Sequence, residues 1–291
     1  MKIWVPILFV FLWSTGFIGA RFGLPYAEPM TFLSVRMLLN IACLGLLIVL
    51  LRPPWPSRPD IWHMVLVGLL LHGIYLGGVF FAIDLGTPTG ITALLVGLQP
   101  LLTTAIAIVY SGFRPSPRQL LGLLLGVLGI ALVLWPKSTS TSLPLAGIVA
   151  STAALAGITL GTLYQKRFCA QQHLLQSTFW QYCGALVLFA PAAWLLEDRT
   201  IDWSLTFSLA LAWSVLVLSV ITILLLLVLI RHGEINRVTS LFFLVPPATA
   251  LQGYLWFNET LSALVILGGI ITLLAVFLIS AASTTSEADN E

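Results

Sequence analysis

The sequence predicts an all-α polytopic membrane protein in which ten transmembrane helices form two inverted five-helix repeats. Three observations predict this fold class: an apolar composition, ten apolar intervals along the chain, and landmarks that recur at an offset of 147 residues. Of the 291 residues, 59% are hydrophobic and 8% are charged. A soluble domain carries roughly 25% charged residues, because its surface must face water. The chain is therefore predicted to lie in a lipid bilayer.

Each predicted span is an apolar interval between charged or turn-forming stretches. A helix needs about 20 apolar residues to cross the hydrocarbon core. The ten intervals are Ile3–Ala20, Pro29–Leu51, Met64–Ile83, Leu85–Phe113, Gln119–Pro136, Ser138–Gln165, Leu174–Leu196, Trp203–Ile230, Val238–Asn258 and Thr260–Ser286. Their apolar runs are continuous and lack alternation, which excludes a transmembrane β-barrel. The first interval continues through Trp13 and ends on a poor cleavage site, so we expect a permanent helix.

Basic residues predict the orientation of the spans. One side carries nine of them, namely Lys2, Arg52, Arg58, Arg114, Arg118, Lys166, Arg167, Arg231 and Arg237. The other side carries three, namely Arg21, Lys137 and Arg199, and Arg36 lies within a span. Because the side richer in Lys and Arg is cytoplasmic, both termini are predicted to lie in the cytoplasm.

The second half of the chain echoes the first. At the offset of 147 residues, the matching pairs are Gly86 with Gly233, Thr92 with Thr239, Pro100 with Pro247, Gly122 with Gly269, and Thr31-Phe32 with Thr178-Phe179. A repeat of five helices has an odd count, so the second copy enters the membrane from the opposite face. We expect repeats at residues 1–136 and 137–282, and a disordered cytoplasmic tail at residues 283–291.

The third and fourth spans resemble a known family. The run from Gly77 to Thr103, GGVFFAIDLGTPTGITALLVGLQPLLT, is similar to the corresponding helices of EamA-type members of the drug/metabolite transporter superfamily. Trp13–Phe17, Arg36 and the segment Asn258-Glu259-Thr-Leu fit the same pattern. The resemblance covers the chain apart from its tail. It implies ten helices, a central cavity between the halves, and export of small metabolites such as amino acids across a bacterial inner membrane.

One feature departs from the family pattern. Members often carry a Gly-Glu pair after both the fourth and the ninth helices. Here Glu259 follows the ninth span, but its counterpart 147 residues earlier is Gly112. A paired role for two such glutamates is therefore not supported by this sequence.

Arg36 is the most distinctive polar residue in the predicted spans. A charge near the centre of a span costs about 2.5–3.5 kcal/mol, so such a residue usually faces a cavity or a partner. Asn40 follows one turn later on the same face. Arg36 either attracts a carboxylate of the substrate or hydrogen-bonds backbone carbonyls near the Pro29 end of its helix. The sequence leaves both interpretations open.

Other polar and aromatic residues are candidates for substrate contact because of their predicted depth. His72 and Tyr75 share one face of the third span at i,i+3 spacing. The remaining candidates are Gln99, Trp13, Tyr164, Gln181 and Gln252. Packing is the alternative role for each of them. No catalytic residue, metal ligand or cofactor site is predicted.

Prolines interrupt the fourth and ninth spans at matching places. Pro100 in the first half corresponds to Pro247 in the second, where Pro246 precedes it. A proline removes a backbone hydrogen bond, which is tolerated inside a membrane where protein or water satisfies the freed carbonyl. Matching breaks in both halves point to a binding site. We expect the cavity where these prolines face each other.

The pattern favours a secondary, non-ATP-driven transporter that works by alternating access. The alternatives are a membrane-embedded enzyme and a non-transporting membrane protein on the same scaffold. Against an enzyme, the sequence has no paired deep carboxylates, metal-binding motif or activated nucleophile. A P-loop for ATP is also missing from the sequence. The net charge of +2 and the lack of a basic run argue against a nucleic-acid partner. The expected partners are a small-molecule substrate and the bilayer, with the chain as a monomer or homodimer.

Overall fold

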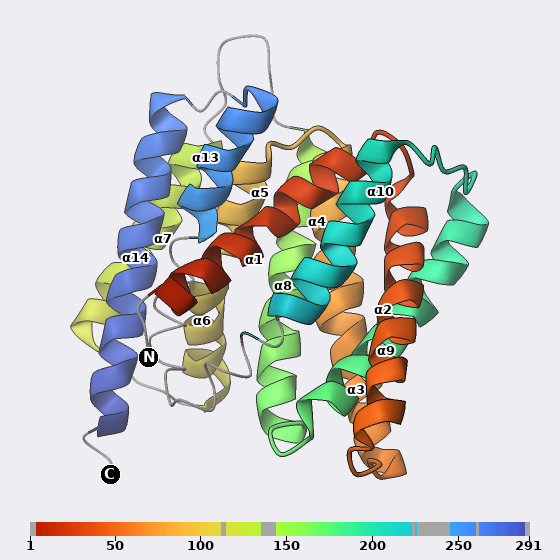
Figure 1. Cartoon of the computed structure of the whole chain (residues 1–291). Helices are drawn as coiled ribbons and strands as arrows, with labels where there is room; N and C mark the ends of the chain where they lie inside the picture. Colours follow the sequence, from red (N-terminus) through yellow and green to blue (C-terminus); the bar gives the residue numbers. More distant parts are fainter. Residues whose placement is uncertain are drawn as a thin grey trace.

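The computed structural model of the protein is a bundle of helices (Figure 1). It describes residues 4–111, 115–134, 144–222, 225, 245–259 and 262–288. In chain order the helices are α1 (Trp4–Gly23), α2 (Pro29–Leu51), α3 (Arg58–Gly68), η1 (Leu69–Ile74), α4 (Tyr75–Asp84), α5 (Thr89–Val96), α6 (Gln99–Ser111), α7 (Pro117–Leu134), α8 (Leu145–Phe168), α9 (Leu174–Leu196), α10 (Leu205–Ala212), η2 (Trp213–Ile221), α13 (Val245–Phe257) and α14 (Ala263–Ala288). The fold class is thus all-α over the described residues.

Several helices have the length and apolarity of membrane spans. Within the described residues, five are long and apolar enough to cross a bilayer: Pro29–Leu51, Arg58–Asp84, Thr89–Tyr110, Leu145–Phe168 and Leu174–Leu196. Shorter apolar helices occupy Ile7–Gly23, Pro117–Gly129, Leu205–Ile221 and Ala263–Leu278. Residues 223, 224 and 226–230 of the predicted eighth span and residues 238–244 of the predicted ninth span lie outside the described residues. The count of ten spans therefore stays a prediction.

Helix boundaries differ from the sequence prediction where local capping or a break decides them. α2 and α9 begin and end at the predicted residues. The third span begins earlier, at Arg58, because the Ser57 side chain accepts a hydrogen bond from the backbone N–H of Asp60 and caps the helix. The fourth span is divided, since α5 ends at Val96 and α6 begins at Gln99.

The segment predicted as a disordered tail is partly helical. α14 runs to Ala288, so residues 283–288 continue the last helix, and residues 289–291 lie outside the described part. Ala281 and Ala282 precede this segment and favour continuation of the helix. The end of α14 therefore overlaps the first six positions of the predicted tail, and the repeat and tail boundaries stay predictions.

Helices of the first half pack against helices of the second half, and the 147-residue repeat relates these contacts to one another. α2 contacts α9 and α7 contacts α14, and each pair joins segments that the 147-residue offset relates. The repeat also relates the contact of α1 with α10 to the contact of α8 with α3. Figure 1 shows α1 crossing the middle of the bundle, between α14 on one side and α2 and α9 on the other. The interior of the molecule is therefore shared between the halves.

Small and aromatic residues fill this interior. Where α7 meets α14, a Cβ on Gly129 would lie 2.9 Å from the backbone oxygen of Gly268, so the helices touch through their backbones. The main core includes Phe32, Phe80, Phe189 and Phe207, each at most 1% exposed. These phenylalanines come from α2, α4, α9 and α10. The core thus ties together the helices that surround the site described next.

Candidate functional site

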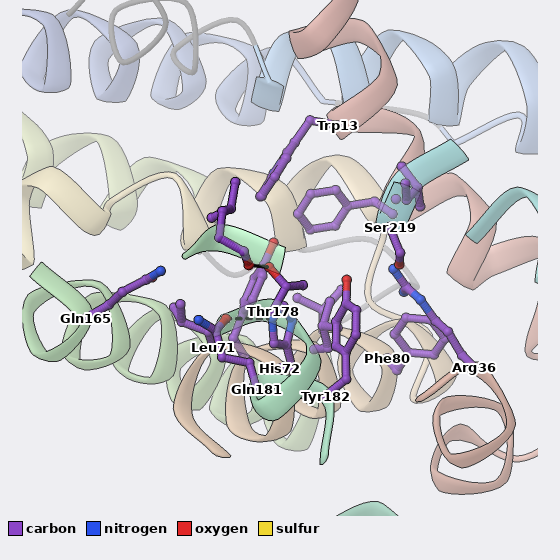
Figure 2. Close-up of a pocket in the computed structure, with 17 residues that line it drawn as sticks. Trp13, Arg36, Leu71, His72, Phe80, Gln165, Thr178, Gln181, Tyr182 and Ser219 are labelled. Atoms are coloured by element: carbon purple, nitrogen blue, oxygen red, sulfur yellow. Dashed lines mark hydrogen bonds between the residues drawn. The ribbon is translucent and has the colours of Figure 1, made fainter. Parts of the chain in front are cut away.

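A cavity of about 210 Å³ lies among α1, α2, α4, α8, α9, η1 and η2. Its polar lining consists of Arg36, His72, Gln165, Thr178, Gln181 and Ser219, and its aromatic lining of Trp13, Phe17, Tyr75, Phe80 and Tyr182. Figure 2 shows Gln165 and Arg36 at opposite ends of the view, with His72 and Gln181 between them. The volume is below the roughly 300–1,000 Å³ of pockets that hold drug-sized ligands. The cavity therefore suits a small metabolite.

Two π-helical segments form matching parts of the wall. In η1 the N–H of Tyr75 bonds to the carbonyl of Leu70, and in η2 the N–H of Thr222 bonds to the carbonyl of Val217. Both are i→i+5 bonds, and the second lies 147 residues after the first. Such bulges are frequent at functional sites, because they re-aim side chains within a helix. Here they direct Leu71 and His72, and their counterparts Leu218 and Ser219, to the cavity lining.

His72 belongs to a chain of hydrogen bonds across the contact of η1 with α9. Its Nε2 lies 3.2 Å from Oε1 of Gln181, and Nε2 of Gln181 donates to Ser177 Oγ at 2.9 Å. With the Gln181 oxygen as acceptor, Nε2 of His72 carries the proton. The close approach depends on Gly68, whose added Cβ would lie 2.0 Å from the backbone oxygen of Gln181. A glycine one turn before His72 thus places the two side chains within reach.

Arg36 enters the cavity from α2 and is 7% exposed. Its Nε has no hydrogen-bond partner in the part of the chain that the structure describes. Figure 2 shows its guanidinium extending toward Ser219 and toward the hydroxyl end of Tyr182. No Asp or Glu among the described residues lines this cavity. A buried cation is therefore presented to the cavity without a protein carboxylate to balance it.

Two tyrosines flank this cation. The Tyr75 hydroxyl is hydrogen-bonded to Trp13, and the Tyr182 hydroxyl to Ser219. Both hydroxyls lie within electrostatic range of Arg36. The Tyr182 ring also packs against His72 at 4.8 Å between centroids. Aromatic rings and hydroxyl groups therefore form one continuous wall from His72 to Arg36.

Aromatic packing and carboxylate capping close one end of the cavity. Phe80 lines the cavity, and its ring centroid lies 5.2 Å from that of Phe32. The Phe32 centroid lies 5.5 Å from that of Phe207, with the two rings edge to face. Beyond this layer, Glu197 accepts hydrogen bonds at 2.7 Å from the backbone N–H groups of Met30 and Thr31 and from the Thr31 hydroxyl. A carboxylate at a helix N-terminus pairs with free N–H groups and the helix dipole. The start of α2 is thus held by the end of α9.

The same end has further contacts between the two connecting segments. The Glu28 carboxylate accepts a bond of 2.8 Å from the backbone N–H of Asp198, and Asp202 donates its N–H to the Tyr26 carbonyl at 2.9 Å. Ala27 and Ile201 form an antiparallel β-bridge. At the other end, the lining includes Gln165 and Leu174, which flank the α8–α9 connection. The two ends of the cavity therefore differ in how they are covered.

Five of the sequence-predicted contact residues line the cavity: Trp13, Arg36, His72, Tyr75 and Gln181. Three others lie elsewhere and have protein partners. Gln99 donates to the hydroxyl of Thr162 at 3.1 Å, and Tyr164 lies 2.7 Å from Nδ1 of His63. Gln252 donates to Ser14 Oγ at 2.9 Å. These three side chains support packing between helices.

The prolines do not meet at this cavity. Pro246 and Pro247 line a second cavity of about 490 Å³ together with residues of α5 and α14, and Pro100 lines neither of the two. Pro246 packs against Gly97, where α5 ends, because a Cβ on Gly97 would lie 3.0 Å from its ring. Pro246 and Pro247 thus border a different cavity from the one that contains Arg36, and a binding site between the prolines stays a prediction.

The other lining residues escaped the sequence reasoning, among them Tyr182, Phe80, Thr178 and Ser219. For Ser219 a signal existed, because the 147-residue offset carries His72 onto it. Thr178 is likewise the counterpart of Thr31, which lies at the capped start of α2. Tyr182 and Phe80 had no such signal, since an aromatic residue in a span packs in a core as readily as it lines a cavity.

Comparisons with known proteins agree with this architecture. The model of the EamA-like transporter family matches residues 1–135 and again residues 145–281. An uncharacterized transporter of Bacillus subtilis, YvbV, is 22% identical over 96% of this chain and 91% of its own length. A probable amino-acid metabolite efflux pump of Salmonella typhimurium is 22% identical over 94% of this chain and 93% of its own. A solved crystal structure with 19% sequence identity superposes with a TM-score of 0.64, covering 99% of this chain and 97% of that one.

Proposed function

The chain belongs to the EamA-like transporter family, and we propose that it is a secondary, non-ATP-driven exporter of small metabolites that works by alternating access. The family and the names of its relatives indicate a membrane transporter rather than an enzyme. The relative named as an amino-acid metabolite efflux pump suggests amino acids and related compounds as the first substrates to test. The expected location is the bacterial inner membrane.

The observation that carries the proposal is the cavity between the halves. Its walls come from α1, α2, η1 and α4 of the first half and from α8, α9 and η2 of the second. A site between two related halves can face one side of the membrane and then the other when the halves rock. The two matches to the family model, one in each half, support a duplicated and inverted arrangement.

The closed end indicates which state the structure represents in this proposal. The aromatic layer of Phe32, Phe80 and Phe207 and the Glu197 cap cover the side that basic-residue counting assigns to the exterior. The opposite end of the cavity reaches Gln165 beside the α8–α9 connection. We therefore interpret this arrangement as the state that receives substrate from the cytoplasm.

Arg36, Tyr75, His72 and Gln181 would hold the substrate. Arg36 supplies the only full positive charge among the described lining residues when His72 is neutral. Charge-assisted hydrogen bonds from a guanidinium to an anionic group are about twice as strong as neutral ones. The sequence also predicts substrate contacts for Trp13, Gln99, Tyr164 and Gln252. Of these four residues, only Trp13 borders the cavity.

Transport in reconstituted vesicles tests the function. Purified protein in proteoliposomes would be given a panel of labelled amino acids and small organic acids, with empty liposomes for comparison. We expect saturable flux of at least one compound, with a strong loss in R36Q. R199Q is the matched control, because Arg199 is exposed, lies over Trp194 at 4.2 Å and is remote from the cavity lining. Flux equal to that of empty liposomes for every compound would contradict the transporter proposal.

A further inference from the structure

We propose that the cavity selects substrates that carry one net negative charge on an apolar body, in preference to zwitterionic amino acids. This inference rests on the proposed transport function and specifies the substrate class of the same site. It follows from a mismatch of charge: the lining offers a buried guanidinium and no described carboxylate.

The first step concerns the free cation. Arg36 is 7% exposed, its Nε has no hydrogen-bond partner among the described residues, and its guanidinium reaches the cavity. A charge held in a low-dielectric interior is costly unless it is paired. Among the described lining residues, its electrostatic neighbours are the neutral hydroxyl groups of Tyr75 and Tyr182, and none of the lining residues is an Asp or Glu. A ligand carboxylate would therefore complete the site, as a planar guanidinium can hold it with two parallel bonds.

The second step concerns an ammonium group. An amino acid brings a cation as well as an anion, and the cation needs about three acceptors or a carboxylate. The Gln181 oxygen already accepts from His72, and no Asp or Glu of the described lining faces the space. With a bound zwitterion, the cavity would keep a net charge of +1 from Arg36. With a monoanion the charges cancel, and a protonated His72 would only add to this preference.

The third step concerns the rest of the ligand. The rest of the lining is largely apolar, with Phe17, Leu71, Leu76, Val79 and Leu218 among its members. Burial of apolar surface is favourable in proportion to the area removed from water. A branched or aromatic body of small size would gain this energy, whereas a second polar group would lose its water. The class is therefore an amphipathic monocarboxylate.

Aromatic faces are a competing attraction that the experiment must separate. Trp13, Tyr75 and Tyr182 border the cavity, and an aromatic face attracts cations. A desolvated contact of this kind is comparable to one charge-assisted hydrogen bond, but a guanidinium can donate two such bonds to one carboxylate. Carboxylate recognition should therefore dominate over ammonium recognition.

A matched series of probes isolates each charge. 3-Phenylpropanoate, 3-phenylpropanamide, phenylalanine and 2-phenylethylamine share one ring and differ in their charged groups. 4-Methylpentanoate, its amide, leucine and 3-methylbutylamine repeat the comparison with a branched body. Binding to the full chain in lipid nanodiscs would be measured by isothermal titration calorimetry for wild type, R36Q, R36K and R199Q. Flux of the best binder would then be measured in proteoliposomes.

We expect each acid to bind about tenfold or more tightly than the amino acid with the same body. R36Q should reduce the affinity for the acid to that of the amide. R36K should restore part of the difference in affinity between acid and amide, and R199Q should keep the wild-type difference. The inference is overturned if the amino acid binds as tightly as the acid, if R36Q retains the difference, or if no acid binds at millimolar concentration. An acid preference without flux would refute transport and keep the charge selectivity. Arg36-dependent flux of amino acids without an acid preference would support transport and refute the charge selectivity.

Discussion

Glu259 caps the first turn of α5 from 170 positions away: its carboxylate accepts bonds from the backbone N–H of Thr89 at 3.0 Å and from the Thr89 hydroxyl at 2.9 Å. This contact joins the end of α13 to the start of α5 and so ties the second half to the first. It explains how a glutamate without a partner at Gly112 can serve the fold. Neither residue lines the cavity that contains Arg36.

Removal of this cap should lower stability more than it lowers transport. E259A deletes the acceptor and the charge at a helix N-terminus, which costs about 1–2 kcal/mol of the free energy of unfolding. E259Q keeps an acceptor and should cost less. Thermal unfolding of the purified protein in one detergent would measure the stability of both variants. T89A, alone and combined with E259A, would test whether the loss of stability comes from the contact between Glu259 and Thr89. Flux per folded molecule should stay close to wild type, and a complete loss of flux in stable E259Q would contradict a purely structural role.

Gly68 should tolerate no side chain. A Cβ at this position would lie 2.0 Å from the backbone oxygen of Gln181, and neither backbone can yield without separating α3 from α9. G68A should therefore destabilise the protein by about 1–3 kcal/mol, as overpacked sites do. G45A is the matched control, because its Cβ would meet the Phe179 ring at 3.5 Å, an ordinary contact. Equal melting temperatures for the two variants would contradict the close approach.

The sequence predicted the helices best where a proline or a charged residue bounds an apolar run. α2 starts at Pro29 and ends before Arg52, and α9 ends before Glu197, so both matched to the residue. The start at Arg58 and the break after Val96 have local signals that apolar length alone does not weigh, because Ser57 caps the first and Pro100 lies four residues after the second. Such boundaries require capping and proline positions to be read together with hydropathy.

The candidate site was predicted only in part for a similar reason. A polar residue in a span must face a partner or a cavity, and this rule selected Arg36 and His72. It could not separate them from Gln99, Tyr164 and Gln252, because the identity of the partner depends on which helix packs alongside. Ser219 was reachable through the 147-residue offset from His72, so applying the repeat to polar residues would have improved the prediction.

The orientation of the helices has a direct test. Counting basic residues predicts that Ser57, between α2 and α3, is cytoplasmic and that Pro144, before α8, is outside. Reporter fusions truncated at these two positions should give opposite signals, with a cytoplasmic marker active only at Ser57 and an exported phosphatase active only at Pro144. Fusions that report the same side would contradict the ten-span arrangement.

The Glu197 cap should control which side of the cavity is open. Its carboxylate holds the backbone N–H groups of Met30 and Thr31, so it must release α2 before the end that carries Phe32 can open. Loss of several charge-assisted bonds that exist only in the closed state shifts the equilibrium toward the open one by a few kcal/mol. E197A should therefore populate a state open on the outside at the expense of the state described here.

Labelling of a cavity cysteine measures this shift. T178C would be placed in a background without Cys43, Cys169 and Cys183, and a membrane-impermeant maleimide would be added from outside. We expect E197A to raise the labelling rate by roughly tenfold or more, since the open population grows with the lost closing energy. D198A is the matched control, because it removes a neighbouring carboxylate while the Asp198 N–H still donates to Glu28. Equal rates in E197A and D198A would show that the cap does not gate the cavity.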